Sequence, residues 1–335
     1  MKRSAASAGA GALAHPEVAR LVSAALREDL GRGDVTTAAT VPPGARGEGQ
    51  MVARGPCVVA GLPLLDLVFG ELGDVRVERR VADGAAVRAG AVLARLEGDL
   101  TAILSGERVA LNLLQRLSGV ATLTQSYVAA VAGTKAQILD TRKTTPGLRL
   151  LEKYAVRMGG GRNHRFGLDD GILIKDNHVA VCGSVREAVT RALAHAPHAL
   201  RVEVECDRLD QVREALAAGA HAVLLDNMGP TDVTRAVKLV AGRALIEVSG
   251  GVDLTTVRFF AEAGADLISV GKLTHSAPAV DIALDFAPPR AAAKRASGAA
   301  KSARRGESRA VRATQPSSRS RATLAGARRH GRRPV

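Results

Sequence analysis

Cysteine is scarce in this sequence, and long apolar runs are absent. The 335 residues include three cysteines, Cys57, Cys182 and Cys206, which are odd in number and far apart. That spacing fits neither a disulfide framework nor a zinc site, so we expect reduced thiols. Because no stretch of about 18 consecutive apolar residues occurs, the sequence predicts no membrane span. The first residues are basic but lack a leucine-rich segment, which argues against a secretory signal and predicts a cytoplasmic protein.

Acidic residues are almost missing from the end of the chain. The whole sequence has 47 Lys and Arg against 33 Asp and Glu, a net charge of +14. Residues 288–335 contain 14 of those cations and one acid, Glu307, and they contain hardly any large apolar side chain. This composition predicts a disordered basic tail. Weak, salt-dependent contacts with nucleic acid are conceivable, but the tail has no aromatic side chain to stack on bases, so a solvated extension is favoured.

The apolar pattern of residues 13–118 predicts a small α+β domain. Residues 15–30 carry an apolar stripe at helical spacing. From Ser105 a cap residue and a second apolar stripe predict another helix, whose polar face includes Arg108. Between the two helices, β-rich stretches cover residues 50–60, 75–81 and 87–96.

Beyond Gly119, short β runs alternate with helical segments, which is typical of parallel strands joined by helices. No G-x-G-x-x-G dinucleotide-binding pattern follows any of these runs. The pattern therefore predicts an α/β barrel over residues 119–276 rather than an open doubly wound sheet, with room for a seventh unit near residues 154–165. The six β runs cover residues 137–141, 171–175, 200–206, 222–226, 244–249 and 266–271.

Four cations, Arg142, Lys143, Arg165 and Lys175, lie at or near the ends of the predicted barrel strands. In such barrels the active site forms at the carboxyl ends of the strands. Cations that point into one mouth repel each other unless an anion lies between them. Arginine presents a planar fork and lysine a point charge, so this mixture predicts a small ligand with more than one carboxylate or phosphate group.

Two acidic residues, Glu205 and Asp226, end later strands of the predicted barrel. Two carboxylates near an anionic ligand are unfavourable without a divalent cation or developing positive charge, which points to a phosphorylated sugar. The ends of the last two strands contain residues 249–251 (SGG) and 271–272 (GK), at the place where barrels commonly bind phosphate.

Eight short sequence blocks occur in a fixed order between residues 15 and 286. They are residues 28–37 (EDLGRGDVTT), 106–119 (beginning GER and ending LSG), 141–149 (TRKTTPGLR), 163–165 (NHR), 175–178 (KDNH), 225–227 (LDN), 249–251 (SGG) and 273–276 (LTHS). Through these blocks the chain resembles the quinolinate phosphoribosyltransferases, which are type II phosphoribosyltransferases.

The resemblance implies a fold and a reaction. The family's fold is an N-terminal α/β sandwich, with residues 277–287 expected to return to it, plus an incomplete α/β barrel of about seven strands. The reaction transfers phosphoribose from phosphoribosyl pyrophosphate to quinolinate, releases pyrophosphate and CO₂, and gives nicotinate mononucleotide in de novo NAD biosynthesis. Mg²⁺ is the implied cofactor, and no organic cofactor is expected.

The resemblance also implies how the diacid is bound. Arg142, Arg165 and Lys175 are expected to hold the two carboxylates of quinolinate. The family works as a homodimer in which an arginine from one subunit completes the other subunit's site, and by position that arginine is Arg108. These cations exceed what a monocarboxylate requires, which favours quinolinate over the acids taken by relatives such as the molybdenum-transport-associated paralogue.

By the same resemblance, Lys143, Glu205 and Asp226 are the expected catalytic residues. Lys143 is expected to meet phosphoribosyl pyrophosphate, while Glu205 and Asp226 bind Mg²⁺ and the ribose hydroxyls. The other expected substrate-binding residues are Thr141, His164, Ser249, Gly250, Gly251, Val270, Gly271, Lys272 and His275.

Two interpretations from other classes stay open on the sequence. A Schiff-base aldolase would use Lys175 as a nucleophile on a barrel strand. A nucleic-acid-binding protein would work through the basic tail alone.

Overall fold

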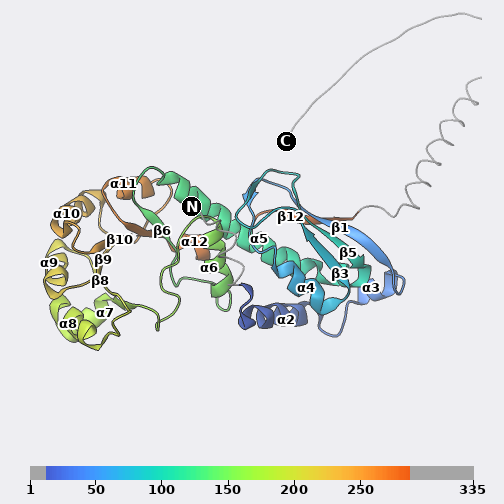
Figure 1. Ribbon diagram of the computed structural model, residues 1–335, viewed down its shortest axis with the longest axis horizontal. Helices are drawn as coiled ribbons and strands as arrows, with labels where there is room; N and C mark the ends of the chain where they lie inside the picture. The colour runs from blue at the N-terminus through green and yellow to red at the C-terminus, as the bar shows by residue number, and fades with distance from the viewer. Residues whose placement is uncertain (1–12, 287–335) are drawn as a thin grey trace, which may run out of the picture. The chain divides into compact units, whose positions relative to one another are not determined.

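The computed structural model describes residues 13–286 and arranges most of their strands in two sheets (Figure 1). The disorder and the nucleic-acid contacts predicted for residues 288–335 lie outside the described residues. The elements of the N-terminal part are α2 (Pro16–Leu30), α3 (Val35–Thr40), β1 (Arg46–Ala53), β2 (Cys57–Val58), α4 (Leu64–Leu72), β3 (Val75–Arg79), β4 (Ala86–Val87), β5 (Val92–Asp99) and α5 (Leu100–Ala130).

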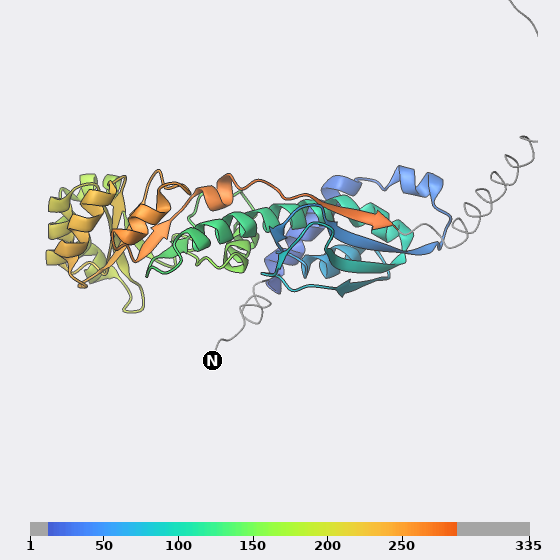
Figure 2. The ribbon, with the colours of Figure 1, turned by 90° about the horizontal axis from the view of Figure 1, so that it is seen from above.

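An antiparallel sheet in the order β12-β1-β5-β3 forms the N-terminal part. Its edge strand β12 (Ile282–Phe286) comes from the other end of the described chain and runs back along β1, as Figure 2 shows in orange. Helices α4 and α5 pack against this sheet, and α2 packs against both helices. The apolar stripe of α2 is buried through Val18, Val22 and Leu26, which confirms the predicted helix.

Helix α5 is longer than the pattern predicted. It begins at Leu100 rather than Ser105, because the Asp99 side chain accepts the backbone N–H of Thr101 and caps the helix. The helix continues past Gly119, where a β-carbon would overlap the carbonyl oxygen of Pro278, so this glycine permits a close approach and does not break the helix. Among residues 13–286, no helix has the length and apolarity needed to cross a membrane.

Six parallel strands form the second sheet, in the order β6-β11-β10-β9-β8-β7. Helices α8 to α11 cover its outer side (Figure 1). The elements are β6 (Gln137–Leu139), α6 (Arg149–Met158), β7 (Ile172–Ile174), α7 (Asp176–Cys182), α8 (Val185–His195), β8 (Val202–Cys206), α9 (Leu209–Ala218), β9 (Ala222–Asp226), α10 (Pro230–Val240), β10 (Leu245–Ser249), α11 (Val257–Glu262), β11 (Leu267–Ser269) and α12 (Lys272–His275).

The barrel is incomplete, as expected. The space predicted for a seventh unit near residues 154–165 holds the end of α6 and a single parallel bridge between Leu139 and Arg162. Within the described part of the chain, β6 and β7 are the two edges and do not pair with each other. An N-terminal sheet domain followed by an α/β barrel is therefore the fold, in agreement with the predicted class.

The barrel strands bury apolar side chains toward the outer helices and leave polar ones for the interior. In β8, Val202, Val204 and Cys206 are buried, whereas Glu203 and Glu205 alternate with them. In β10, Glu247 lies between the buried Ile246 and Val248. Because successive side chains of a strand point to opposite faces, these polar residues point into the barrel.

Candidate active site

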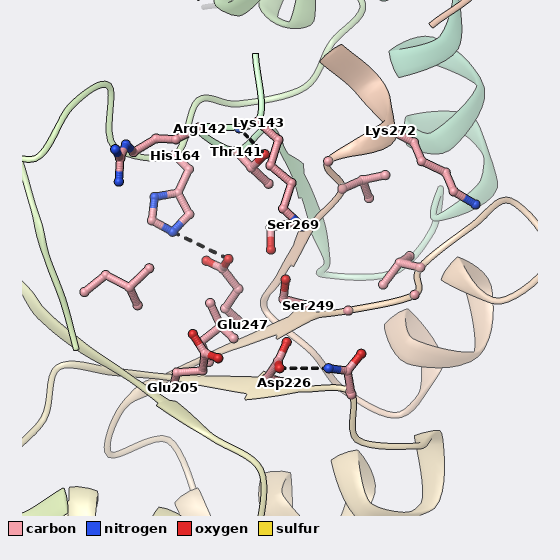
Figure 3. A pocket seen from close by; sticks show the side chains of 18 of the residues that line it. Thr141, Arg142, Lys143, His164, Glu205, Asp226, Glu247, Ser249, Ser269 and Lys272 are labelled. Carbon is pink, nitrogen blue, oxygen red and sulfur yellow. Dashed lines mark hydrogen bonds and ion pairs between the residues drawn. The ribbon is translucent and has the colours of Figure 1, made fainter. Parts of the chain in front are cut away.

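One cavity of about 670 Å³ opens at the carboxyl ends of the barrel strands. This volume is typical of small-molecule sites. Figure 3 shows side chains from several strands pointing into the same space. Arg108 does not line the cavity, and its side chain is exposed on α5. All the other predicted site residues line it, namely Thr141, Arg142, Lys143, His164, Arg165, Lys175, Glu205, Asp226, Ser249, Gly250, Gly251, Val270, Gly271, Lys272 and His275.

The cationic side of the cavity is formed by Arg142, Arg165 and Lys175. Within residues 13–286, no carboxylate lies within ion-pair distance of either arginine, and Nε of Arg142 is buried without a hydrogen-bond partner. Burial and then the charge of Arg142 lower the pKa of Arg165, so the two guanidinium groups repel each other. Lys175 has an acidic neighbour, because its Nζ lies 3.6 Å from Glu205. The excess of positive charge is suited to an anionic ligand.

His164 lies above a buried acidic floor made of Glu203 and Glu247. Its Nε2 lies 3.4 Å from Oε2 of Glu203. It also lies 3.6 Å from Oε1 of Glu247, a contact that Figure 3 shows as a dashed line. Burial lowers the pKa of His164, but the two carboxylates outweigh it and raise the pKa overall. Burial and then the charge of Glu203 raise the pKa of Glu247 to about 8, which favours its protonated form at neutral pH.

These three side chains could hold a metal ion by distance alone, since their ligand atoms lie within 4.8 Å of one another. The hydrogen bonds of the imidazole argue against it. Nδ1 of His164 accepts the backbone N–H of Arg165 at 2.6 Å, which places the ring proton on Nε2, facing the carboxylates. A metal would have to displace that proton, so the cluster is better suited to hydrogen bonding.

The acidic side of the cavity is formed by Glu205 at the end of β8 and Asp226 at the end of β9. Burial raises the pKa of Glu205, the charge of Lys175 lowers it and the charge of Asp226 raises it, so the three groups are close enough to interact. Asn227 donates from Nδ2 to Oδ2 of Asp226 at 2.8 Å and orients that carboxylate. Two carboxylates beside a cavity for an anion fit a hard divalent cation such as Mg²⁺.

Glycines bring the backbone to the cavity at the ends of the last strands. Gly250 has φ of 91°, and a β-carbon there would overlap the side chain of Asn227. Gly251 also has a positive φ, and a β-carbon on it would meet nothing within 4 Å. The helix after Gly271 spans only four residues, so its dipole is small. Backbone N–H groups at glycine turns are suited to an anion. Lys272 points away from the other labelled side chains in Figure 3.

The sequence reasoning assigned no role to three residues that matter here: Glu247 and Ser269, which line the cavity, and Glu203, which contacts His164 beneath it. Each lies within a strand rather than just after one. The alternation of polar and apolar residues along β8 and β10 was the available signal, because it places every second side chain inside the barrel.

A parallel barrel whose carboxyl end combines a cation cluster, paired carboxylates and glycine turns has the features of a barrel enzyme that acts on a small anionic substrate. The quinolinate phosphoribosyl transferase N-terminal domain matches residues 34–118, and the C-terminal domain matches residues 120–285. The two matches meet within α5.

Relatives of known name agree with these domain matches. The nicotinate-nucleotide pyrophosphorylase (carboxylating) of Mycobacterium leprae is 48% identical over 270 residues, 78% of this chain and 94% of the relative. Quinolinate phosphoribosyltransferase (decarboxylating) 2, mitochondrial, of Nicotiana glauca is 41% identical over 293 residues, 81% of this chain and 83% of the relative. The crystal structure of NadC from Streptococcus pyogenes has a TM-score of 0.78 at 41% identity, with 81% of this chain and 98% of that chain covered. The chain belongs to the quinolinate phosphoribosyltransferase family and is a phosphoribosyltransferase.

Proposed function

We propose that this enzyme transfers phosphoribose from phosphoribosyl pyrophosphate to the ring nitrogen of quinolinate, with release of pyrophosphate and CO₂, and so makes nicotinate mononucleotide for NAD biosynthesis. The observation that carries the choice of acid is the convergence of Arg142, Arg165 and Lys175 on one cavity. Two guanidinium groups without carboxylate partners and an ammonium group match two adjacent carboxylates better than one. Family membership replaces the Schiff-base aldolase interpretation of Lys175.

The phosphoribosyl group is proposed to lie against the opposite wall. Ser249, Gly250, Gly251, Gly271 and His275 line that wall, and backbone N–H groups at glycine turns bind phosphate well. This arrangement would place the sugar carbon that reacts between the phosphate wall and the ring held by the arginines.

Glu205 and Asp226 are proposed to bind Mg²⁺ together with the pyrophosphate group. Their carboxylate oxygens fit the ion, which would neutralise charge on the leaving group. No organic cofactor is needed, because the alkylated, positively charged ring nitrogen stabilises the electron pair left on the neighbouring carbon when CO₂ leaves, and that carbon then takes a proton from water.

The residues of the chain then have separate tasks in the transfer. Cleavage of the bond between ribose C1 and pyrophosphate leaves positive character on the sugar and negative charge on the leaving group. Lys143, which has no ion-pair partner within residues 13–286, is suited to the departing pyrophosphate and is expected to contribute about 3 kcal/mol, roughly a hundredfold in rate. Glu205 and Asp226 favour the positive sugar, and the arginines orient the ring for attack.

The proposal includes a homodimer in which Arg108 of the partner subunit completes the cationic side. Two facts support it: Arg108 is exposed on α5, and it does not line the cavity of its own chain. We also place the reaction in the cytoplasm, where the free thiols of Cys57, Cys182 and Cys206 would stay reduced.

The test is a product assay with purified protein, quinolinate, phosphoribosyl pyrophosphate and Mg²⁺. Nicotinate mononucleotide and one equivalent of CO₂ are the expected products. Nicotinate serves as the comparison substrate and is expected to react far more slowly. Formation of the mononucleotide from nicotinate without CO₂, at a rate equal to or above that with quinolinate, would refute the assignment of the acid.

A further inference from the structure

Helix α6 carries two consecutive charged residues that are shielded from solvent. Glu152 is 0% exposed and Lys153 is 3% exposed, yet neither lines the cavity. Consecutive residues of a helix point about 100° apart, so the two side chains reach different neighbours. Their neighbours connect to different parts of the cavity wall.

Lys153 holds the segment that carries His164. Its Nζ contacts Oδ1 of Asp140 and donates to the carbonyl oxygen of His164 at 3.1 Å. Oδ1 of Asp140 in turn accepts the backbone N–H of His164 at 2.9 Å, and Oδ2 accepts the side-chain amide of Asn163. Both backbone groups of His164 are therefore fixed by one ion pair, and Arg142 follows Asp140 by two residues.

This ion pair is a poor source of stability. Burial raises the pKa of Asp140 and lowers the pKa of Lys153 by more than their mutual attraction restores. Buried pairs of this kind are often neutral or unfavourable relative to apolar residues of the same size. What the pair supplies is a fixed geometry for the segment between Asn163 and Arg165.

Glu152 holds the segment that carries Lys143. Its carboxylate accepts the backbone N–H and the hydroxyl of Thr145 at 3.0 and 2.8 Å, and Nη2 of Arg116 at 2.7 Å. Arg116 also donates to the carbonyl oxygen of Thr274, whose hydroxyl donates to the carbonyl oxygen of Lys143 at 2.7 Å. Glu152 thus fixes Lys143 and helix α12 relative to each other.

We propose that Lys153 and Glu152 are positioning residues for two separate halves of the cavity. Lys153 positions the diacid half, defined as Arg142, His164, Arg165 and Lys175. Glu152 positions the phosphoribosyl pyrophosphate half, defined as Lys143, Gly271 and His275. The names of the halves, though not the contacts, rest on the proposed function.

The test separates the two halves by their substrates. The variants are Lys153→Met, the double variant Asp140→Asn with Lys153→Met, and Glu152→Gln. The matched control for Lys153→Met is Lys135→Met. Lys135 lies just before β6 and forms an exposed ion pair with Asp266. The matched control for Glu152→Gln is Glu262→Gln, which removes an exposed ion pair with Arg258 on α11. Each protein is measured for melting temperature, for KM of both substrates and for calorimetric binding of quinolinate.

The double variant is expected to melt above Lys153→Met, because it leaves no unpaired buried charge. It should still raise the KM and the dissociation constant for quinolinate about tenfold or more, since methionine cannot hold the carbonyl of His164. The KM for phosphoribosyl pyrophosphate should stay within about twofold of the unchanged protein. Glu152→Gln should show the reverse pattern, and the two controls should change neither constant.

Folded variants that shift both substrates equally, or shift neither, would overturn the proposal. A double variant that does not fold would overturn it as well, because the pair would then be needed for stability. The unchanged protein is assayed first, so a failure of the proposed function is seen before any variant is compared.

Discussion

Replacement of Glu247 by glutamine should make the protein more stable, by an amount that grows with pH. Glu247 is 1% exposed, and burial next to Glu203 raises its pKa to about 8 from an ordinary value of 4.5. Between these two values the folded protein keeps the proton that the unfolded chain releases, so stability falls as pH rises through this window. Below pH 4.5 both states are protonated and the effect vanishes.

The magnitude follows from the width of the window. Between pH 4.5 and pH 8, each pH unit lowers the free energy of unfolding by about 1.4 kcal/mol. Raising the pH from 5 to 7 therefore lowers it by about 2 to 3 kcal/mol. Glutamine does not ionise and escapes that cost while it keeps nearly the same shape. Urea denaturation of Glu247→Gln and of the unchanged protein at pH 5, 6, 7 and 8 measures the difference directly.

The control for this experiment is Glu262→Gln, because Glu262 is an exposed residue of α11. Its stability difference from the unchanged protein is expected to stay flat across the same pH range. Equal slopes for Glu247→Gln and the unchanged protein would show that Glu247 is ionised in the folded state, and the account of the acidic floor would be wrong.

Three further predictions concern binding. Arg142→Ala and Lys175→Ala should each raise the KM for quinolinate about a hundredfold and change the KM for phosphoribosyl pyrophosphate little, because each removes a charge-assisted contact to a carboxylate; steady-state kinetics with each substrate varied in turn checks this. Mixed Arg108→Ala and Arg142→Ala subunits should recover about a quarter of the unchanged activity, since about half of the dimers are hybrids with one intact site; no recovery would exclude a shared site. Gly250→Ala should weaken binding of phosphoribosyl pyrophosphate in calorimetry, because φ of 91° strains alanine and its β-carbon meets Asn227; unchanged binding would contradict the phosphate wall.

The site residues at the strand ends were predictable from the sequence, because the position of a residue along a parallel strand decides which end of the barrel it reaches. Arg142, Lys175 and Asp226 lie at the ends of recognisable β runs, and the carboxyl ends of parallel strands meet at one rim. The structure brings all three to one cavity. The fold class was predictable for the same reason, since it depends on local periodicity.

The buried charges on α6 were not predictable from local pattern. Glu152 and Lys153 have the composition of a solvated helix face, and their partners Arg116 and Asp140 lie 36 and 13 residues away along the chain. Charged residues are almost never fully buried unless they are paired, and a pairing across elements leaves no periodic signal. The close contact of Gly119 with Pro278 leaves no local signal either, because the two residues are far apart in sequence.

The pairing of β12 with β1 affects how the N-terminal sheet folds while the chain is being synthesised on the ribosome. The N-terminal sheet gains its edge strand only after Phe286 has left the ribosome, since Gly49 pairs with that residue. Until then β1 exposes a row of backbone donors and acceptors, which is a template for association between nascent chains. Synthesis that stops after α12 would leave this edge open permanently, so a truncated product should aggregate even though every barrel strand is present.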